Sequence, residues 1–152
     1  MRDRSLHFSQ AARRLRIKGR AKGREALDVL VAASRSGQSF NMRANAASLL
    51  SRIRDARAED ALELMTATTE DRNLRITALN ALGATGDSVR ASTLALRLIG
   101  DYDPLFAAAA VRVLARTGGE AGKAQLRAAM AHESRVFVRL AMQQALAPPA
   151  AH

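Results

Sequence analysis

The chain has no cysteine and no tryptophan, and only 3% of its 152 residues are aromatic. Without cysteine it can form no disulfide, no thiolate nucleophile and none of the usual cysteine-ligated zinc sites. It also lacks any apolar run of about 18 residues, so we expect no transmembrane helix. The arginine-rich N-terminus lacks the apolar core of a secretory signal. We therefore expect a cytoplasmic protein.

Alanine and leucine are the most abundant hydrophobic residues of the chain. Hydrophobic residues make up 48% of the chain, which is enough for one continuous core. Because alanine and leucine favour helices and β-branched residues are sparse, the composition predicts an all-α fold.

Apolar residues recur at intervals of 32 residues, which predicts a repeat protein. One ladder consists of Met42, Leu74, Phe106 and Val138, with Ala46, Ala78, Ala110 and Met142 four residues on and Leu50, Leu82, Leu114 and Leu146 eight residues on. A second ladder consists of Leu30, Leu62, Leu94 and Leu126. Two ladders in different segments of the same period indicate pairs of antiparallel helices.

The ladders give the expected organisation. The first helices of each pair are predicted over 41–53, 72–83, 104–116 and 134–147, and the second helices over 57–67, 88–99 and 121–131. A helix is also expected over 5–18, an exposed connection over 18–24, and a short amphipathic helix between Ala26 and Ala33. We divide the chain into a basic N-terminal arm (1–24), a repeat domain (25–147) and a tail (148–152).

The clearest repeat runs from Asp71 to Gly83, with Leu74, Arg75, Ala78 and Leu82 between them. This pattern resembles the HEAT-like repeats of bacterial scaffold proteins, including the short form found in phycobilin lyases. The resemblance covers residues 40–147 and implies an α-solenoid of about four HEAT-like repeats. Two kinds of position depart from the pattern: Ala107 replaces the arginine, while Ser39 and Arg135 replace the aspartate.

The polar residues of the motif have structural roles in this interpretation. Asp71 and Asp103 stand where a carboxylate accepts N–H groups at a helix start. Arg43 and Arg75 are close enough in the repeat register to reach the carboxylates of the following repeat, Asp71 and Asp103 respectively. The alternative is that each arginine is simply exposed one turn into its helix.

No sequence motif in the chain indicates a catalytic, phosphate-binding or metal-binding site. The segment 118–124 lacks the spacing and the Ser or Thr of a phosphate-binding loop, and it follows a predicted helix, so we expect an interhelical turn. The three histidines are too scattered for a metal site. Glu59, Asp60 and Glu63 fit a solvated acidic face better than an acid–base pair. We expect no enzyme activity, no cofactor and no metal.

The net charge of +10 is concentrated in the arm. Residues 1–24 hold nine basic side chains and one acidic, whereas the remainder holds fifteen basic and thirteen acidic. We expect these residues to dock on an anionic partner: Arg13, Arg14, Arg16, Lys18, Arg20, Lys22 and Arg24. That partner is a nucleic acid, an anionic lipid surface or an acidic protein. The alternative is a solvated arm without a partner.

Two further surfaces are candidates for binding. If the array resembles other HEAT proteins, the second helices line its concave side, and their exposed charges change sign along it: Glu59, Glu63, Arg90, Arg97, Lys123 and Arg127. The last predicted helix has no successor, so Phe137, Leu140 and Ala141 form a candidate interface for a homodimer or an end-on partner. The alternative is that these side chains fold back into the core.

Repeat arrays are mostly binding scaffolds, so the sequence favours a non-enzymatic scaffold or adaptor that mediates protein–protein interaction. The second hypothesis is a nucleic-acid-binding protein that holds phosphates through the arm and the basic second-helix residues. The third, a lyase-type chaperone or cofactor-handling subunit, follows from the resemblance alone.

Overall fold

The computed structural model describes residues 20–36 and 39–148, and these residues form eight helices and no strand. The helices are α2 (Arg20–Ser36), α3 (Phe40–Leu50), α4 (Ala56–Thr68), α5 (Arg72–Leu82), α6 (Ser88–Leu98), α7 (Pro104–Thr117), α8 (Gly119–Met130) and α9 (Val136–Leu146). The all-α prediction is confirmed, and the helices predicted from residue 41 onward lie within a few residues of their observed bounds.

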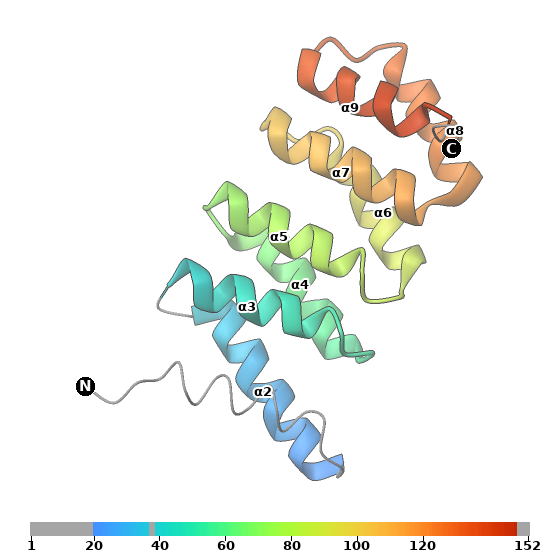
Figure 1. The fold of residues 1–152 in the computed structure, drawn as a ribbon. Helices are drawn as coiled ribbons and strands as arrows, with labels where there is room; N and C mark the ends of the chain where they lie inside the picture. Colours follow the sequence, from blue (N-terminus) through green and yellow to red (C-terminus); the bar gives the residue numbers. More distant parts are fainter. Residues whose placement is uncertain (1–19, 37–38, 149–152) are drawn as a thin grey trace. The chain divides into compact units, whose positions relative to one another are not determined.

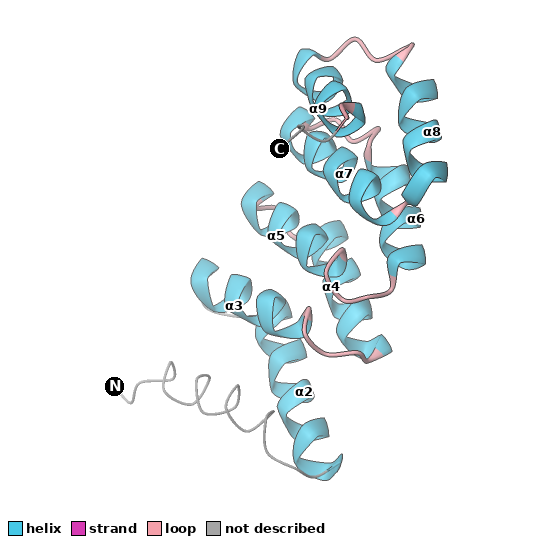
Figure 2. Ribbon diagram, turned by 45° about the vertical axis from the view of Figure 1, so that its right-hand side comes forward, coloured by secondary structure: helices cyan, strands magenta, loops and turns pink. Residues whose placement is uncertain are grey.

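The chain divides into two compact units, residues 1–81 and 82–152. In the first unit α2 packs against α3 and α4, and in the second α7 packs against α6, α8 and α9. Figures 1 and 2 show two layers in each unit: α3 and α5 lie opposite α2 and α4, and α7 and α9 lie opposite α6 and α8. The motif helices therefore form one layer of each unit and the leucine-ladder helices form the other.

The repeat ladders form the core of both units. Leu30, Leu62 and Leu126 are completely buried, as are Leu50, Leu82 and Phe106 in the motif helices. Burying a side chain of this size contributes about 1.5–3 kcal/mol each. Ala46, Ala78 and Ala110 are also completely buried, and their small size lets neighbouring helices approach closely. The periodicity of the sequence thus reports packing rather than a functional site.

Aspartate and serine side chains cap most of the helix starts. Asp71 Oδ1 accepts a hydrogen bond from the Leu74 N–H at 3.0 Å, and Asp103 Oδ1 accepts from the N–H groups of Leu105 and Phe106 at 3.0 and 3.3 Å. Both caps confirm the roles predicted from the motif. Equivalent bonds are made by Ser39 at α3, Asp55 at α4 and Asp87 at α6.

The beginning of α2 differs from the prediction. The exposed connection expected over 18–24 is wrong from Arg20 onward, because α2 begins there and contains Gly23. Arginine, alanine and lysine are strong helix formers and together they outweigh a single glycine, which costs about 1 kcal/mol. The predicted helix over 5–18 lies outside the described residues, and the boundary at residue 24 stays a prediction.

The interhelical turn predicted over 118–124 is wrong for most of its length, because only Gly118 lies between α7 and α8 and residues 119–124 belong to α8. Gly118 ends α7, and Gly119 begins α8 with a φ of +57°, in the left-handed region that favours glycine. A Cβ atom on Gly122 would lie 2.9 Å from the carbonyl oxygen of Leu114. The glycines therefore serve the close packing of α7 on α8, and their resemblance to a phosphate-binding loop has no structural basis.

Candidate binding surfaces

The motif arginines bind main-chain carbonyls of the preceding helix. Arg43 Nε donates to the carbonyl oxygen of Ser34 at 3.0 Å, and Arg75 Nε donates to that of Thr66 at 3.0 Å. Both acceptors lie nine residues earlier, in the last turns of α2 and α4, where carbonyl groups have no partner within their helix. The arginine of the motif is therefore a C-terminal cap for the preceding helix.

Arg43 also reaches the following repeat, but not through the carboxylate that was predicted. Its Nη2 donates to the hydroxyl oxygen of Thr69 at 2.7 Å, while Asp71 Oδ1 accepts from the backbone of its own helix. The predicted pairing of Arg43 with Asp71 is thus wrong, because Thr69 in the loop before α5 is the group that the guanidinium meets.

Arg135, which replaces an aspartate in the last copy of the motif, makes a related connection in the second unit. Its Nη2 donates to the carbonyl oxygen of Ile99 at 2.8 Å and its Nη1 to that of Asp101, and the guanidinium forms an ion pair with Glu133 at 2.7 Å. Ile99 follows the repeat equivalent of Ser34 and Thr66, and Glu133 is the repeat equivalent of Thr69. Arg135 thus supplies the contacts expected of the arginine that Ala107 replaces.

The ion pair between Arg135 and Glu133 changes the acidity of the carboxyl group. The hydrogen bond from the Arg135 side chain lowers the pKa of Glu133 below its usual value, and the backbone N–H of Arg135 adds to this effect. The same hydrogen bond raises the pKa of Arg135. One consequence of placing an arginine here is that α9 begins without a side-chain cap.

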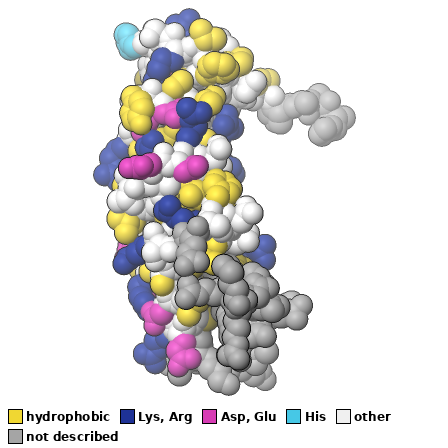
Figure 3. All heavy atoms as spheres, turned by 90° about the vertical axis from the view of Figure 1, so that its left-hand side faces the viewer, with side chains coloured by type: hydrophobic (Ala, Val, Ile, Leu, Met, Phe, Trp, Pro, Cys, Tyr) yellow, Lys and Arg dark blue, Asp and Glu magenta, His cyan; other side chains and the backbone are white. Residues whose placement is uncertain are grey.

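Exposed hydrophobic side chains gather where α7 and α9 begin. The two helices pack together in the same direction (Figure 1), and the bonds from Arg135 hold the start of α9 against the loop before α7. This edge carries five exposed side chains: Tyr102 (89% exposed), Leu105 (41%), Val136 (77%), Phe137 (61%) and Leu140 (46%). We call these five residues the apolar edge. Figure 3 shows several hydrophobic side chains in the upper part of the molecule, with Lys and Arg side chains between them.

The apolar edge revises the interface predicted for the last helix. Phe137 and Leu140 are exposed as expected, but Ala141 is buried, since it lies beside Met142 and one turn after Val138 on the core stripe of α9. The side of α9 that carries Val138, Ala141 and Met142 is covered, because α9 packs against both α7 and α8. Sequence reasoning missed Tyr102, Leu105 and Val136. A signal was available, because Leu105 and Phe137 stand where earlier repeats have Asn41 and Asn73.

The charged candidates from the leucine-ladder helices divide between the two units. Glu59 and Glu63 are half-buried on α4 in the first unit. On α6 and α8 in the second unit, Arg97 and Arg127 are exposed, and Arg90 and Lys123 are half-buried. Lys123 Nζ pairs with Glu120 at 3.0 Å, and Glu59, Glu63, Arg90 and Arg97 each interact with another group. A change of charge along one continuous face stays a prediction.

Most of the predicted anion-binding residues lie outside the part of the chain described. Arg13, Arg14, Arg16 and Lys18 precede residue 20. Arg20 and Lys22 fall in the first turn of α2, and Arg24 is exposed in the second. That first turn contains no acidic residue. Docking of these residues on an anionic partner stays a prediction.

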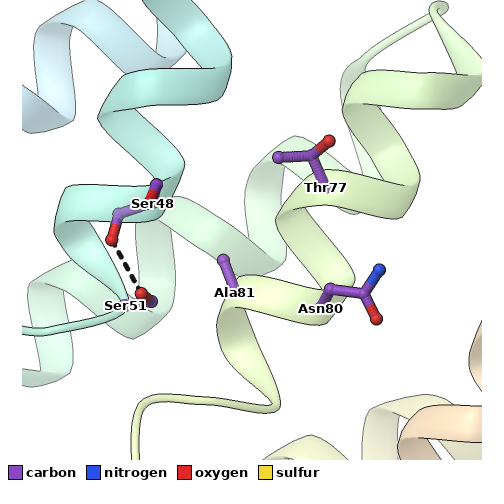
Figure 4. A pocket seen from close by; sticks show the side chains of 5 residues that line it. All are labelled: Ser48, Ser51, Thr77, Asn80 and Ala81. Atoms are coloured by element: carbon purple, nitrogen blue, oxygen red, sulfur yellow. Dashed lines mark hydrogen bonds between the residues drawn. The ribbon is translucent and has the colours of Figure 1, made fainter.

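A shallow polar depression lies between α3 and α5 in the first unit. It encloses about 330 Å³ and is lined by Ser48, Ser51, Thr77, Asn80 and Ala81. Figure 4 shows Ser48 on α3 and Ser51 directly after it on one side, and Thr77, Asn80 and Ala81 on α5 on the other, with the Asn80 side chain pointing away from the serines. The hydroxyls of Ser51 and Thr77 donate to carbonyl groups of their own helices. No charged group or histidine lines the depression to activate a nucleophile.

Within residues 20–36 and 39–148, no three His, Cys, Asp or Glu side chains are grouped so that they could hold a metal ion. No helix in these ranges has the length and apolar character needed to cross a membrane.

Comparison with known families agrees with the repeat pattern. The family model for HEAT repeats matches residues 27–95 and 64–147. A comparison with curated proteins gave no match. The family match confirms the HEAT-like repeats and the α-solenoid fold class predicted from the sequence, whereas a relationship to the phycobilin-lyase type is not confirmed.

Proposed function

Because the chain belongs to the HEAT-repeat family, whose repeats commonly mediate protein interaction and are typically non-enzymatic, we propose that it is a scaffold or adaptor that binds protein through its apolar edge. The observation that carries this proposal is the gathering of Tyr102, Leu105, Val136, Phe137 and Leu140 at one edge of the second unit.

The size and make-up of the apolar edge support a protein partner. Five large side chains expose an apolar area on the order of several hundred Å², similar to the largest patches of typical monomers, about 300–600 Å², which are often functional. Tyrosine and phenylalanine are enriched in the centres of protein interfaces. By contrast, the other exposed large hydrophobics are dispersed over four helices, at Val29, Phe40, Leu64 and Val89.

The test is affinity enrichment from the source cells, using the full chain as bait and quantitative mass spectrometry as the readout. Bait carrying Phe137→Ala and Leu140→Ala should lose the proteins that the wild-type chain captures, because truncating a hot-spot residue at the centre of an interface costs about 2 kcal/mol or more. A captured protein is then purified and titrated against both baits.

The matched control is bait carrying Arg116→Ala, which changes an exposed residue of α7 away from the helix start. It should capture the same proteins as the wild type. The proposal is overturned if the two apolar-edge substitutions leave every captured protein unchanged. A homodimer is one form that this interface can take. Sedimentation as a monomer at high micromolar concentration would argue against that form.

A second candidate function is docking of the N-terminal arm on an anionic partner, and the form of it that a gel shift tests is binding to the phosphates of a nucleic acid. It rests on the nine cations within residues 1–24. Phosphate contacts of this kind weaken steeply with salt. A gel-shift series with generic RNA and DNA should show binding that decreases with salt and is lost when residues 1–19 are deleted, which leaves α2 complete. Binding that persists after this deletion would contradict a role for the arm.

A further inference from the structure

The outer sides of α3 and α5 carry the same kind of side chain at matching positions. On α3, Asn41, Asn45 and Ser48 are spaced by four and three residues and so share one side of the helix. The positions 32 residues later on α5 hold Asn73, Thr77 and Asn80. Five of these six residues are exposed, and Thr77 is half-buried. We call these six residues the amide row.

The amide row is uncharged in a protein of which 25% of the residues are charged. Exposed helix faces are ordinarily rich in Lys, Arg, Glu and Asp. The row is also confined to the first unit, since the equivalent positions of α7 and α9 hold Leu105, Ala109, Arg112, Phe137, Ala141 and Gln144. The repeat fold itself therefore does not require amides at these positions.

The polar groups of the row are available to a ligand. Among the described residues, the side-chain amides of Asn41, Asn45, Asn73 and Asn80 make no hydrogen bond within the chain. Each can donate two hydrogen bonds and accept two. The hydroxyl hydrogen of Thr77 is engaged by the carbonyl oxygen of Asn73 at 2.8 Å, so Thr77 Oγ1 faces a ligand as an acceptor.

The row borders the depression between α3 and α5, which supplies room for a chain to lie close to the helices. Ser48, Thr77 and Asn80 belong to both (Figure 4). Ala81 at its floor keeps the approach open because its side chain is a single methyl group. The depression is open and shallow, and its walls present hydroxyl and amide groups in place of an apolar pocket.

These features favour one kind of ligand. The absence of charge argues against phosphates and anionic lipids, which are bound by clustered cations. The scarcity of large apolar side chains argues against the apolar face of a helix. A primary amide offers the same donor and acceptor as the peptide main chain. Packed helices are about 8–10 Å apart, which is roughly three residues of extended chain at about 3.3 Å each.

We propose that the amide row binds an extended segment of polypeptide through its main chain, with successive repeats contacting residues about three apart. The proposal rests on the proposed function to the extent that the chain binds protein. The amide row is a different surface from the apolar edge. It would recognise the main chain of its partner, and the partner's side chains at the row would be uncharged.

The probe is a set of random 12-residue peptides displayed on phage and selected against the full chain. The best peptide is synthesised with a fluorophore and titrated by anisotropy. Replacing Asn41, Asn73 and Asn80 together by alanine should weaken binding by roughly 150-fold, since each lost hydrogen bond costs about 1 kcal/mol and every 1.4 kcal/mol is a factor of ten. The melting temperature should not fall, because the three amides are exposed and alanine favours a helix more than asparagine does. N-methylation of every third peptide amide should weaken binding similarly.

The control variant carries Phe137→Ala and Leu140→Ala, and it should bind the peptide as the wild type does. The proposal is contradicted if no peptide is enriched, if the triple variant binds normally, or if N-methylation has no effect. It is also contradicted if the control variant alone loses the peptide, a result that would support the apolar edge. The two proposals can fail separately. If the triple variant loses the peptide while the control variant still captures the same proteins from cells, only the proposed function of the apolar edge is contradicted.

Discussion

At the scale of single residues, the arginine contacts show how two departures from the repeat pattern belong together. Arg43 and Arg75 cap the preceding helix from the second turn of a motif helix. Ala107 removes that arginine from α7, and Arg135 approaches Ile99 and Asp101 from the start of α9. Arg135 therefore caps the end of α6, but because it stands in the place of an aspartate, α9 begins without a side-chain cap.

This relationship predicts that Ala107→Arg changes the free energy of unfolding in opposite directions in the wild type and in the Arg135→Ala variant. Arg135→Ala should lower the free energy of unfolding by about 2–3 kcal/mol, since hydrogen bonds from a charged donor are lost. Ala107→Arg should destabilise the wild-type protein, because Ala107 is completely buried. In the Arg135→Ala background the same substitution should stabilise, because the space and the acceptors become available. Urea denaturation of the four proteins measures this coupling.

Arg116→Ala, on the exposed side of α7, serves as the control and should change the free energy of unfolding by less than about 0.5 kcal/mol. The explanation is contradicted if Ala107→Arg destabilises both backgrounds by the same amount. Additive effects would mean that the two positions do not share their partners.

Glu133 gives a prediction for pH. Its pKa is lower in the folded protein than the unfolded value of about 4.3, chiefly because of the Arg135 hydrogen bond. The charged carboxylate therefore stabilises the fold above about pH 4.3, and this contribution is lost as the pH falls through the lower folded pKa. The wild type should be more stable than Glu133→Gln near neutral pH, and the difference should shrink on acidification below about pH 4.

Unfolding monitored by circular dichroism at a series of pH values measures this difference for the two proteins. Gln keeps the volume and one acceptor oxygen of Glu133, but it removes the charge, the titration and the second oxygen that accepts from Arg135. A difference in stability that stays constant between about pH 7 and 3 would show that the carboxylate does not contribute through its charge.

At the scale of helices, the sequence predicts most of the structure, and its failures have definite causes. The leucine ladders and the aspartate caps act within one helix or between neighbours, so periodicity reveals them. Gly19 and Gly23 favour an exposed connection over 18–24, but Gly23 lies inside α2. The contacts of Arg135 could not be predicted, because its carbonyl acceptors lie 34 and 36 residues earlier and any residue type supplies a carbonyl.

Two helical glycines give opposite predictions. Gly122→Ala should lower the free energy of unfolding by about 1–3 kcal/mol, because the added Cβ meets main-chain atoms of α7 that cannot move aside easily. Gly23→Ala, with nothing within 4 Å of its added Cβ, should raise it by about 0.5–1 kcal/mol through a less flexible unfolded chain. Thermal unfolding of the two variants measures both effects. Equal effects would contradict the close packing of α8 on α7.

At the scale of the whole molecule, the repeats account for the fold, and function is expected where equivalent positions differ. Positions 41 and 73 are asparagines in the first unit, whereas positions 105 and 137 are Leu105 and Phe137 in the second. The same helix face thus offers hydrogen bonds in one unit and an apolar edge in the other. The sequence alone predicts that Phe137 and Leu140 are exposed, but not that the loop residue Tyr102 is exposed at the same edge.

The apolar edge includes backbone groups that can report on a bound partner. Because Arg135 provides no cap, the first N–H groups of α9 have no side-chain acceptor and exchange with solvent readily in the free protein. A protein seated on Val136 and Phe137 would exclude water from these groups. Their exchange rates therefore distinguish binding at the apolar edge from binding elsewhere on the chain.

Hydrogen–deuterium exchange of the chain with and without a captured, purified protein partner is the most direct test of the central claim. The claim predicts slower exchange over residues 101–106 and 135–141 in the complex, with α4 and α6 unchanged. Protection confined to other helices, with these two segments exchanging as in the free protein, would contradict the assignment of the apolar edge as the binding surface.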